Sequence, residues 1–246
     1  MNKILGVIPA RYASTRFPGK PLIDIIGKTM IQRVYEQSVK AECFYKVVVA
    51  TDDERILNHV KEFGGNAVMT SINHQTGTDR CNEVLYYEEE KPDVVINIQG
   101  DEPYIEPEQL ELVASLFSRT EVQIATLVKQ LKNNYDLFNP SIIKVVKDVN
   151  DKALFFSRSA IPFNRSSPNQ EWANKGIYFK HIGIYAYRSD VLSKISALKQ
   201  SPLELTESLE QLRWLENGYT IHVAETNHDS YSVDVPEDLK RFEGRE

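Results

Sequence analysis

Three cations, Arg11, Arg16 and Lys20, lie within ten residues near the start of the chain, among small residues. They follow an apolar run, Ile4 to Ile8, that has the length and composition of a buried strand. Prolines within and beside this stretch rule out a regular helix or central strand, so we expect a loop. Backbone N–H groups and cations in such a loop can converge on phosphate oxygens, which predicts a triphosphate site. The alternative is a solvated basic loop that binds nothing.

Two aspartates stand where an apolar run ends. Asp101 follows the run from Asp93 to Ile98, and Asp234 lies between an apolar run and Pro236. Carboxylates bind Mg²⁺, usually one or two of them beside substrate phosphates. Together with the basic loop they predict a site for Mg²⁺ and a triphosphate. Taken singly, Asp101 could be a turn residue and Asp234 a helix cap.

The first half of the chain alternates apolar runs with amphipathic segments, which predicts crossover units and a mainly parallel sheet. The expected strands are 4–8, 46–50, 67–69 and 93–98, and the expected helices are 29–41, 53–63, 79–90 and 107–117. Open sheets of this kind bind ligands at the carboxyl ends of their strands. The basic loop and Asp101 both fall at that edge.

The second half of the chain has a different pattern. We expect strands at 123–131, 142–147, 153–157, 181–187, 220–224 and 232–235, and helices at 204–217 and from Pro236 onward. A turn rich in Asp and Asn joins 142–147 to 153–157, which predicts an appended antiparallel hairpin. Residues 163–176 are polar and aperiodic, so we expect a flexible loop. The predicted fold is therefore α/β, with three layers, a mainly parallel central sheet and this hairpin, in one domain spanning 1–246.

Composition narrows the class of partner. The chain has 246 residues and a net charge of -6, so the basic loop is expected to meet a small anion and not a nucleic acid. No segment approaches the roughly 20 apolar residues that cross a membrane, so no membrane partner is expected. Cys43 and Cys81 have no metal or redox spacing, which favours free thiols in a reducing, cytoplasmic setting.

Signatures of other enzyme classes are missing from the sequence. There is no Gly-x-Gly-x-x-Gly and no Gly-x-x-x-x-Gly-Lys-Ser/Thr, so a dinucleotide oxidoreductase or a P-loop kinase is poorly supported. The hydrolase signature Gly-x-Ser-x-Gly is absent too.

Seven segments, in order, resemble the sugar nucleotidyltransferases that make CMP-activated acidic sugars, and among them the 3-deoxy-manno-octulosonate cytidylyltransferase family. These segments are 8–21, 74–80, 97–103, 156–162, 181–185, 209–213 and 233–239. The resemblance covers essentially the whole chain and implies the Rossmann-like nucleotide-diphospho-sugar transferase fold. It also implies that CTP and Kdo (3-deoxy-D-manno-octulosonate) give CMP-Kdo and pyrophosphate, for lipopolysaccharide biosynthesis.

The resemblance also implies roles for the residues singled out above. Arg11, Lys20, Asp101 and Asp234 would be catalytic, and the two aspartates would hold Mg²⁺. The nucleotide would be bound by Pro9, Ala10, Arg11, Ser14, Arg16, Lys20, Gly77, Thr78 and Arg80. The sugar acid would be bound by Gln99, Arg158, His181, Tyr185, Glu210 and Gln211.

The sugar-binding residues have plainer interpretations as well. Arg158 can bind both oxygens of a carboxylate through its planar fork, but it could be a surface arginine. His181 and Tyr185 face the same side of a strand and could be a hydrogen-bonded core pair. Glu210 and Gln211 fit the pattern of solvated helix residues.

Two functional alternatives stay open on the sequence. One keeps the reaction but uses 8-amino-Kdo or another acidic sugar. The other is a non-catalytic sugar-nucleotide sensor on the same fold. By resemblance the protein is expected to be a homodimer, with hairpin 142–157 and loop 163–176 as insertions for dimerisation and sugar binding. The hairpin has a physical reason to pair, because its six apolar residues cannot all be covered by one sheet. They are Ile142, Val145, Val146, Leu154, Phe155 and Phe156.

Overall fold

A computed structural model describes residues 2–13, 17–229 and 231–242. Nine strands within these ranges form one sheet. Its main path runs through β11 (Ile221–Glu225), β7 (Ile124–Gln130), β10 (Phe179–Arg188), β6 (Val94–Asn97), β1 (Ile4–Ala10), β4 (Lys46–Thr51) and β5 (Ala67–Met69). The hairpin of β8 (Lys144–Lys147) and β9 (Ala153–Ser157) continues from β10.

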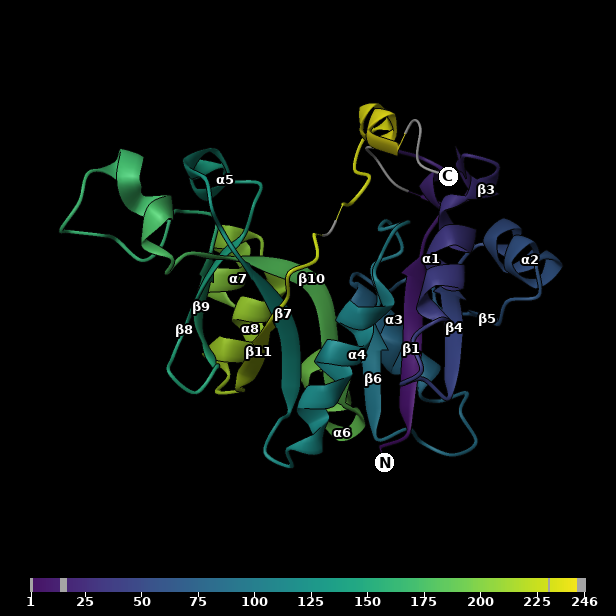
Figure 1. The fold of residues 1–246 in the computed structure, drawn as a ribbon. Helices are drawn as coiled ribbons and strands as arrows, with labels where there is room; N and C mark the ends of the chain where they lie inside the picture. The colour runs from purple at the N-terminus through teal and green to yellow at the C-terminus, as the bar shows by residue number, and fades with distance from the viewer. Residues whose placement is uncertain (1, 14–16, 230, 243–246) are drawn as a thin grey trace.

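The strand directions confirm a mainly parallel sheet with an appended antiparallel hairpin. Strands β6, β1, β4 and β5 run parallel, and so do β7 and β11. Strand β10 lies antiparallel between β6 and β7 and joins the two parallel groups (Figure 1). The first half is parallel because each of its strands returns through a crossover helix.

Helices cover both faces, which confirms the three layers. On one face lie α1 (Met30–Ser38), α2 (Glu54–Glu62) and α4 (Pro107–Ser115). On the other lie α3 (Gly77–Val84), α6 (Ser189–Ser196) and α8 (Glu210–Glu216). Strand β1 shows why both faces need cover: Ile4 and Ile8 belong to the first apolar cluster, and Leu5 and Val7 to the second.

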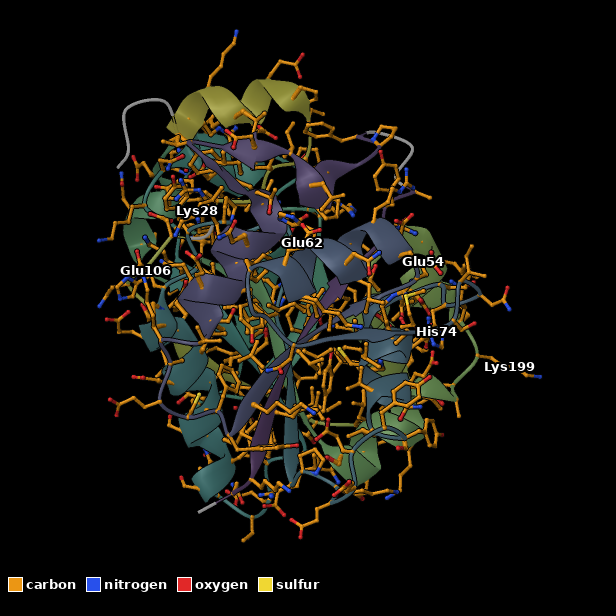
Figure 2. The ribbon with its side chains drawn as sticks, turned by 90° about the vertical axis from the view of Figure 1, so that its right-hand side faces the viewer. Lys28, Glu54, Glu62, His74, Glu106 and Lys199 are labelled. Atoms are coloured by element: carbon orange, nitrogen blue, oxygen red, sulfur yellow. The ribbon has the colours of Figure 1, made fainter. Side chains whose placement is uncertain are left out.

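The turned view places α2 in front, with Glu54 and Glu62 at its two ends (Figure 2). Asp53 begins this helix by accepting a hydrogen bond from the backbone N–H of Arg55, as its sequence position predicts. Gly64 ends it with a positive φ of 82°.

Several short elements complete the chain. They are η1 (Lys20–Leu22), β2 (Asp24–Ile25), β3 (Lys28–Thr29), η2 (Leu116–Ser118), α5 (Asn134–Phe138), η3 (Asn169–Lys175), α7 (Pro202–Glu207) and η4 (Pro236–Phe242). Helices α5 and α6 were not expected from the sequence. In the part of the chain that the structure describes, no helix is both long and apolar enough to cross a membrane.

Three boundaries predicted from the sequence are wrong. The expected helix 204–217 is broken at Ser208, whose φ of 52° lies in the left-handed region and separates α7 from α8. The expected helix 79–90 spans Gly77–Val84 instead. Residues 232–235 form no strand, because the N–H of Val233 donates to Asp101 O and to no ladder partner (3.0 Å).

The loop 163–176 contains the 3-10 helix η3 and is therefore not wholly irregular. Trp172 is only 3% exposed and stacks on Tyr178, with ring centroids 6.0 Å apart. This small aromatic cluster gives the loop a core of its own, and its flexibility stays a prediction.

Candidate active site

Two neighbouring cavities open at the carboxyl ends of β1 and β6. The first, about 280 Å³, is bordered by Arg11, Lys20, Arg80 and Asp101, and we call it the basic cavity. The second, about 200 Å³, is bordered by Tyr185, Tyr187, Glu210, Gln211 and Trp214, and we call it the aromatic cavity. Both are also lined by Pro9, Gly77, Gln99 and Gly100.

The shared wall depends on a close approach between two strand ends. A Cβ on Gly100 would lie 2.8 Å from the carbonyl oxygen of Pro9. Because real Cβ contacts are never that short, only glycine lets the loop after β6 lie against the end of β1. The two cavities therefore meet at a wall made of backbone.

Charge in the basic cavity is arranged in pairs. Lys20 Nζ lies 2.7 Å from Asp101 Oδ2 in a mostly buried ion pair. Gly19, with a φ of 72°, turns the loop so that its N–H donates to Tyr12 O at 3.0 Å. Ala10 and Arg11 line the cavity from the end of β1. The predicted nucleotide-binding residues Ser14 and Arg16 lie outside the described residues.

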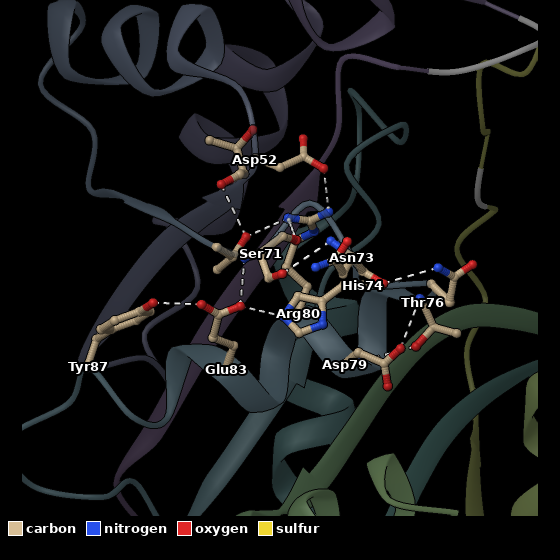
Figure 3. Close-up of polar contacts among 12 residues, drawn as sticks. Asp52, Ser71, Asn73, His74, Thr76, Asp79, Arg80, Glu83 and Tyr87 are labelled. Carbon is tan, nitrogen blue, oxygen red and sulfur yellow. Dashed lines mark hydrogen bonds and ion pairs between the residues drawn. The ribbon is translucent and has the colours of Figure 1, made fainter. Parts of the chain in front are cut away.

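A polar network fixes the loop that forms the far side of this cavity (Figure 3). Arg80 is 4% exposed, and its Nη2 donates to Asp52 Oδ2 at 2.8 Å while Nη1 donates to Thr70 Oγ1. Glu83 accepts the N–H of Ser71 at 2.8 Å and also contacts His74. Arg80 thus borders the cavity, but its guanidinium is turned toward the protein.

The same loop ends in a capped helix. Thr76 accepts the N–H of Asp79 at 3.1 Å, and the Asp79 carboxylate accepts the N–H of Thr76 in return, also at 3.1 Å. This reciprocal cap begins α3, so Gly77 and Thr78 face the cavities from its first turn.

Aromatic rings form one wall of the aromatic cavity. Tyr185 and Tyr187 stack with centroids 6.1 Å apart, and Trp214 meets them edge-on at 5.0 Å and 5.5 Å. The Tyr185 hydroxyl and the Trp214 indole N–H are buried and have no hydrogen-bond partner among the described residues. Buried polar groups are nearly always hydrogen-bonded, so two orphans at one cavity point to a polar ligand.

Glu210 lies where α8 begins and reaches into this cavity. Its Oε2 accepts a hydrogen bond from Thr78 Oγ1 at 3.0 Å. Burial raises the pKa of Glu210 to about 7, so at neutral pH the carboxyl is present in both protonation states. The α7–α8 break at Ser208 places Glu210 in a first turn, and Gln211 lines the cavity beside it.

Gln99 joins the two cavities to the central antiparallel strand. Its Nε2 donates to Gly183 O at 2.8 Å, and it borders both cavities. The register of β10 against β7 shifts between Ile182 and Tyr185, so this carbonyl lies at a bulge. Bulges next to sites re-aim side chains, and this one holds Gln99 in place.

Two predicted sugar-binding residues, His181 and Arg158, do not border either cavity. His181 Nε2 lies 3.0 Å from Thr126 Oγ1, and burial lowers the pKa of His181 to about 3, which keeps the ring neutral. Its ring contacts that of Tyr185 at 5.1 Å, so the two do share a side of β10. Their sugar-binding roles stay predictions.

Arg158 holds the corner between α7 and α8. Its Nε donates to Glu207 O at 2.7 Å and its Nη1 to Pro140 O at 3.1 Å. The guanidinium thus bonds backbone carbonyls, while the Glu207 carboxylate accepts the backbone N–H of Arg158 at 2.9 Å. The guanidinium therefore anchors the segment that leads into Glu210.

Asp234 is brought toward Asp101 by the backbone. The N–H of Val233 donates to Asp101 O at 3.0 Å, so Asp234 is one residue from that contact. The donor types fit Mg²⁺, since both groups are hard carboxylates, but only Asp101 lines the basic cavity and Asp234 borders neither cavity. No cluster of three or more His, Cys, Asp or Glu suited to a metal exists in the described ranges, so phosphate oxygens would have to complete the shell.

Comparison with known proteins gives the family. The model of the cytidylyltransferase family matches residues 5–222. A 3-deoxy-manno-octulosonate cytidylyltransferase of Parabacteroides distasonis is 55% identical over 98% of this chain and 97% of that protein. The chain belongs to this family. Another member, from Bacteroides thetaiotaomicron, is 54% identical over 98% of this chain and 97% of its own length.

A solved structure agrees with the family. It is described as CMP:2-keto-3-deoxy-manno-octonic acid synthetase complexed with CTP, and it matches with a TM-score of 0.89 at 44% identity. The match covers 97% of this chain and 96% of that one. A 4-diphosphocytidyl-2C-methyl-D-erythritol synthase from Anaerococcus prevotii, at 12% identity and a TM-score of 0.62, shares the fold alone.

Sequence reasoning missed three residues that line the aromatic cavity of this family member: Asn97, Tyr187 and Trp214. All three lie in apolar runs or on the buried stripe of a helix, where a core position is the ordinary interpretation. Trp214 differs from a core tryptophan in its indole N–H, which has no partner in the described structure. The sequence gives no sign of this.

Proposed function

We propose that the protein transfers the cytidylyl group of CTP to Kdo, giving CMP-Kdo and pyrophosphate. One observation carries this: a cation-lined cavity and a cavity with unpartnered polar atoms share a wall of Pro9, Gly77, Gln99 and Gly100. A triphosphate in the first and a polyhydroxylated acid in the second would meet at that wall. The family membership supports the same reaction.

Arg11 and Lys20 would bind the triphosphate. Lys20 already faces a carboxylate, so a phosphate group would share its charge with Asp101. Gly77 and the loop held by Arg80 would enclose the nucleoside, since that loop forms the far side of the basic cavity. The network around Arg80 lowers the entropy cost of ordering the loop when CTP binds.

The sugar acid would occupy the aromatic cavity. Gln99, Tyr185, Glu210 and Gln211 border it and offer both donors and acceptors to hydroxyl groups. Trp214 adds one donor that nothing else in the described structure uses. His181 and Arg158 do not border the cavity and would act indirectly. His181 would act through its contact with Tyr185, and Arg158 through the corner between α7 and α8.

The reaction is an in-line displacement. The anomeric hydroxyl oxygen attacks the α-phosphorus and forms the new O–P bond. The bond between the α-phosphorus and the bridging oxygen breaks, pyrophosphate leaves with that electron pair, and the hydroxyl proton passes to water. Catalysis by this chain is then mostly positioning and charge neutralisation.

We also propose that Asp101 and Asp234 hold Mg²⁺. When bound, the ion would lower the pKa of the sugar hydroxyl and neutralise charge on the triphosphate. The residues of this chain then have separate tasks. Asp101 and Asp234 orient the cation, and Arg11 and Lys20 take up charge on the leaving pyrophosphate.

Release of pyrophosphate tests the reaction. With CTP and Mg²⁺, we expect release that depends on Kdo and is faster with Kdo than with 8-amino-Kdo at equal concentration. Faster release with the 8-amino sugar would assign that substrate instead. No release with either sugar, from protein that binds CTP, would leave the sensor interpretation.

We propose a homodimer, with the outer side of the β8–β9 hairpin as its interface. Val145 and Phe156 are fully buried against the protein's own core, so they are not the contact. Leu154 is 61% exposed on β9 and is the natural partner-facing residue. A stable dimer should bury about 1,600 Å² or more.

Light scattering tests this assembly. We expect a dimeric mass at micromolar concentration and a monomeric mass for Leu154→Glu. A monomeric mass for the active wild-type protein would contradict the dimer. A dimeric Leu154→Glu would move the interface away from the hairpin. We further propose a cytoplasmic enzyme that serves lipopolysaccharide biosynthesis, because CTP is a cytoplasmic substrate.

A further inference from the structure

The segment that carries Asp234 crosses open sheet before it reaches the site. Residues 226–229 and 231–235, which we call the strap, connect β11 to η4 and pass over β7 and β10 (Figure 1). Its start is held by the N–H of Thr226, which donates to Val128 O at 2.9 Å. Its end is held by the contact of Val233 with Asp101.

Between these ends, Asp229 binds two lysines. Asp229 Oδ2 lies 2.6 Å from Lys129 Nζ, and Oδ1 lies 2.8 Å from Lys180 Nζ. Burial opposes the charge on Asp229, yet the two lysines hold its pKa below the usual value. One carboxylate therefore ties the strap to two strands at once.

The two lysines would repel each other without this carboxylate. Lys129 on β7 and Lys180 on β10 are directly opposed partners in the antiparallel ladder. Like charges directly opposite on one face destabilise a sheet. Asp229 offsets that repulsion, so the sheet and the strap stabilise each other at this point.

The lysines do not face the aromatic cavity. Leu127 and Ile182, two residues along each strand from them, belong to the apolar cluster under α1 and α4. Tyr185, which borders the cavity, belongs to the cluster on the other face. Since strand side chains alternate, Lys129 and Lys180 lie on the side away from the sugar pocket. Direct binding of the sugar therefore does not explain them.

We propose that Asp229, gripped by Lys129 and Lys180, is a positioning residue that sets the placement of Asp234 at the reaction site. Asp234 lies five positions after Asp229, so at most about 17 Å of extended chain joins them. The segment is therefore held at Asp229 and again at Val233, directly before Asp234. This inference rests on the metal role proposed for Asp234.

Hydrogen exchange at the Val233 amide tests the anchor without any metal. In Asp229→Asn we expect this amide to exchange about tenfold faster, because its bond to Asp101 O opens more often. Asp190→Asn is the matched control, since Asp190 also binds a lysine, Lys194 at 2.8 Å, but on the surface of α6. Asp229→Glu, which keeps the charge, should restore most of the protection. Unchanged protection in Asp229→Asn would overturn the proposal.

Binding of Mn²⁺ in the presence of CTP, followed by electron paramagnetic resonance, tests the consequence. Asp229→Asn should weaken Mn²⁺ binding several-fold and raise the Mg²⁺ requirement for turnover, with the KM for the sugar unchanged. An equal rise in the KM for the sugar would indicate general loosening and contradict a positioning role. If Asp234→Asn leaves Mn²⁺ binding unchanged, the metal assignment fails, whereas the exchange experiment still decides whether Asp229 anchors the strap.

Discussion

The basic cavity and the aromatic cavity differ in how their polar groups are satisfied by the protein. In the basic cavity Lys20 is paired with Asp101, and Arg80 with Asp52. In the aromatic cavity the Tyr185 hydroxyl and the Trp214 N–H have no partner in the described structure. The basic cavity thus contains charges that the protein itself pairs, whereas the aromatic cavity contains buried donors that have no protein partner in the described structure.

This difference follows from the chemistry of the two ligands proposed. Cations beside a binding loop repel one another, and Lys20 and Arg80 are each held by a carboxylate. Neutral donors carry a smaller desolvation cost, and the stack of Tyr185, Tyr187 and Trp214 keeps them in place through ring packing. Affinity for a triphosphate should therefore depend on salt, and affinity for the sugar much less.

The largest effect should come from Asp101 and Asp234, the two carboxylates proposed to hold Mg²⁺. Asp101→Asn and Asp234→Asn are each expected to lower turnover at limiting Mg²⁺ by about 100-fold or more, since several kcal/mol of charge stabilisation would be lost. The melting temperature should hardly change for Asp234→Asn, whose side chain is only partly buried, and should fall modestly for Asp101→Asn, which removes the partner of Lys20. Steady-state kinetics with Asp190→Asn as control measures this. Near-normal turnover in both variants would remove the metal assignment.

Next in size is the buried ion pair behind the basic cavity. Arg80→Met leaves Asp52 without its cation, so the free energy of unfolding should fall by about 3 kcal/mol. The exposed pair of Lys194 and Asp190 offers the matched control, and Lys194→Met should cost less than about 1 kcal/mol. Urea unfolding followed by circular dichroism compares the two. Equal losses would mean that the loop is not held by this pair.

Substitution of Arg158 should weaken binding of the sugar more than binding of CTP. Arg158→Lys keeps the charge but loses the fork that binds Glu207 O and Pro140 O. We expect the KM for Kdo to rise about tenfold, the cost of roughly one charged hydrogen bond, with a smaller change for CTP. Initial rates measured against each substrate test this. Equal rises for both substrates would place Arg158 outside the sugar side.

The smallest effect should be a pH dependence centred on Glu210. The pKa of this carboxyl is raised to about 7 by burial, so it is neutral below that pH and charged above it. An anionic sugar should then bind less tightly as pH rises from 6 to 8, by roughly fivefold for a repulsion of about 1 kcal/mol.

Glu210→Gln should remove this pH dependence, because the amide resembles the neutral form. The stability of the fold should change with pH in the same direction as sugar binding. A raised pKa in the folded state stabilises the fold at low pH, and this contribution is lost as pH rises through about 7. Thermal melts of both proteins from pH 5 to 8 should therefore converge at the acidic end. A pH-dependent KM for Kdo in the variant would assign the effect to another group.

The strands were predicted well from the sequence, and the breaks between elements were predicted poorly. Strand β9 begins and ends at the expected residues, Ala153 and Ser157, because runs rich in aromatic residues and bounded by turn residues are typical of strands. The break at Ser208 was missed because nothing in local propensity demands a left-handed residue there. It is held by tertiary contacts, among them the bond from Arg158 to Glu207 O.

The sequence predicted the charged residues of the candidate site and missed two of its aromatic ones. Lys20 and Asp101 meet as expected, because both follow parallel strands that end at the same edge. Trp214 and Tyr187 were overlooked, because a buried ring on an apolar stripe gives no sign of a cavity beside it. Residues 232–235 were taken for a strand, and the bond from the Val233 N–H to Asp101 O shows instead that they lie against the loop after β6.

The position of β10 has a consequence for how the protein is synthesised. Strand β7 ends at residue 130, but the strand that separates it from β6 ends only at residue 188. As the chain leaves the ribosome, β1, β4, β5 and β6 can pair at once, while β7 must wait until β10 is complete, 58 residues later. The sheet is thus closed across its middle late in synthesis. Because Tyr185 and Tyr187 lie on β10, and Glu210, Gln211 and Trp214 follow on α8, the aromatic cavity is completed only after this seam has closed.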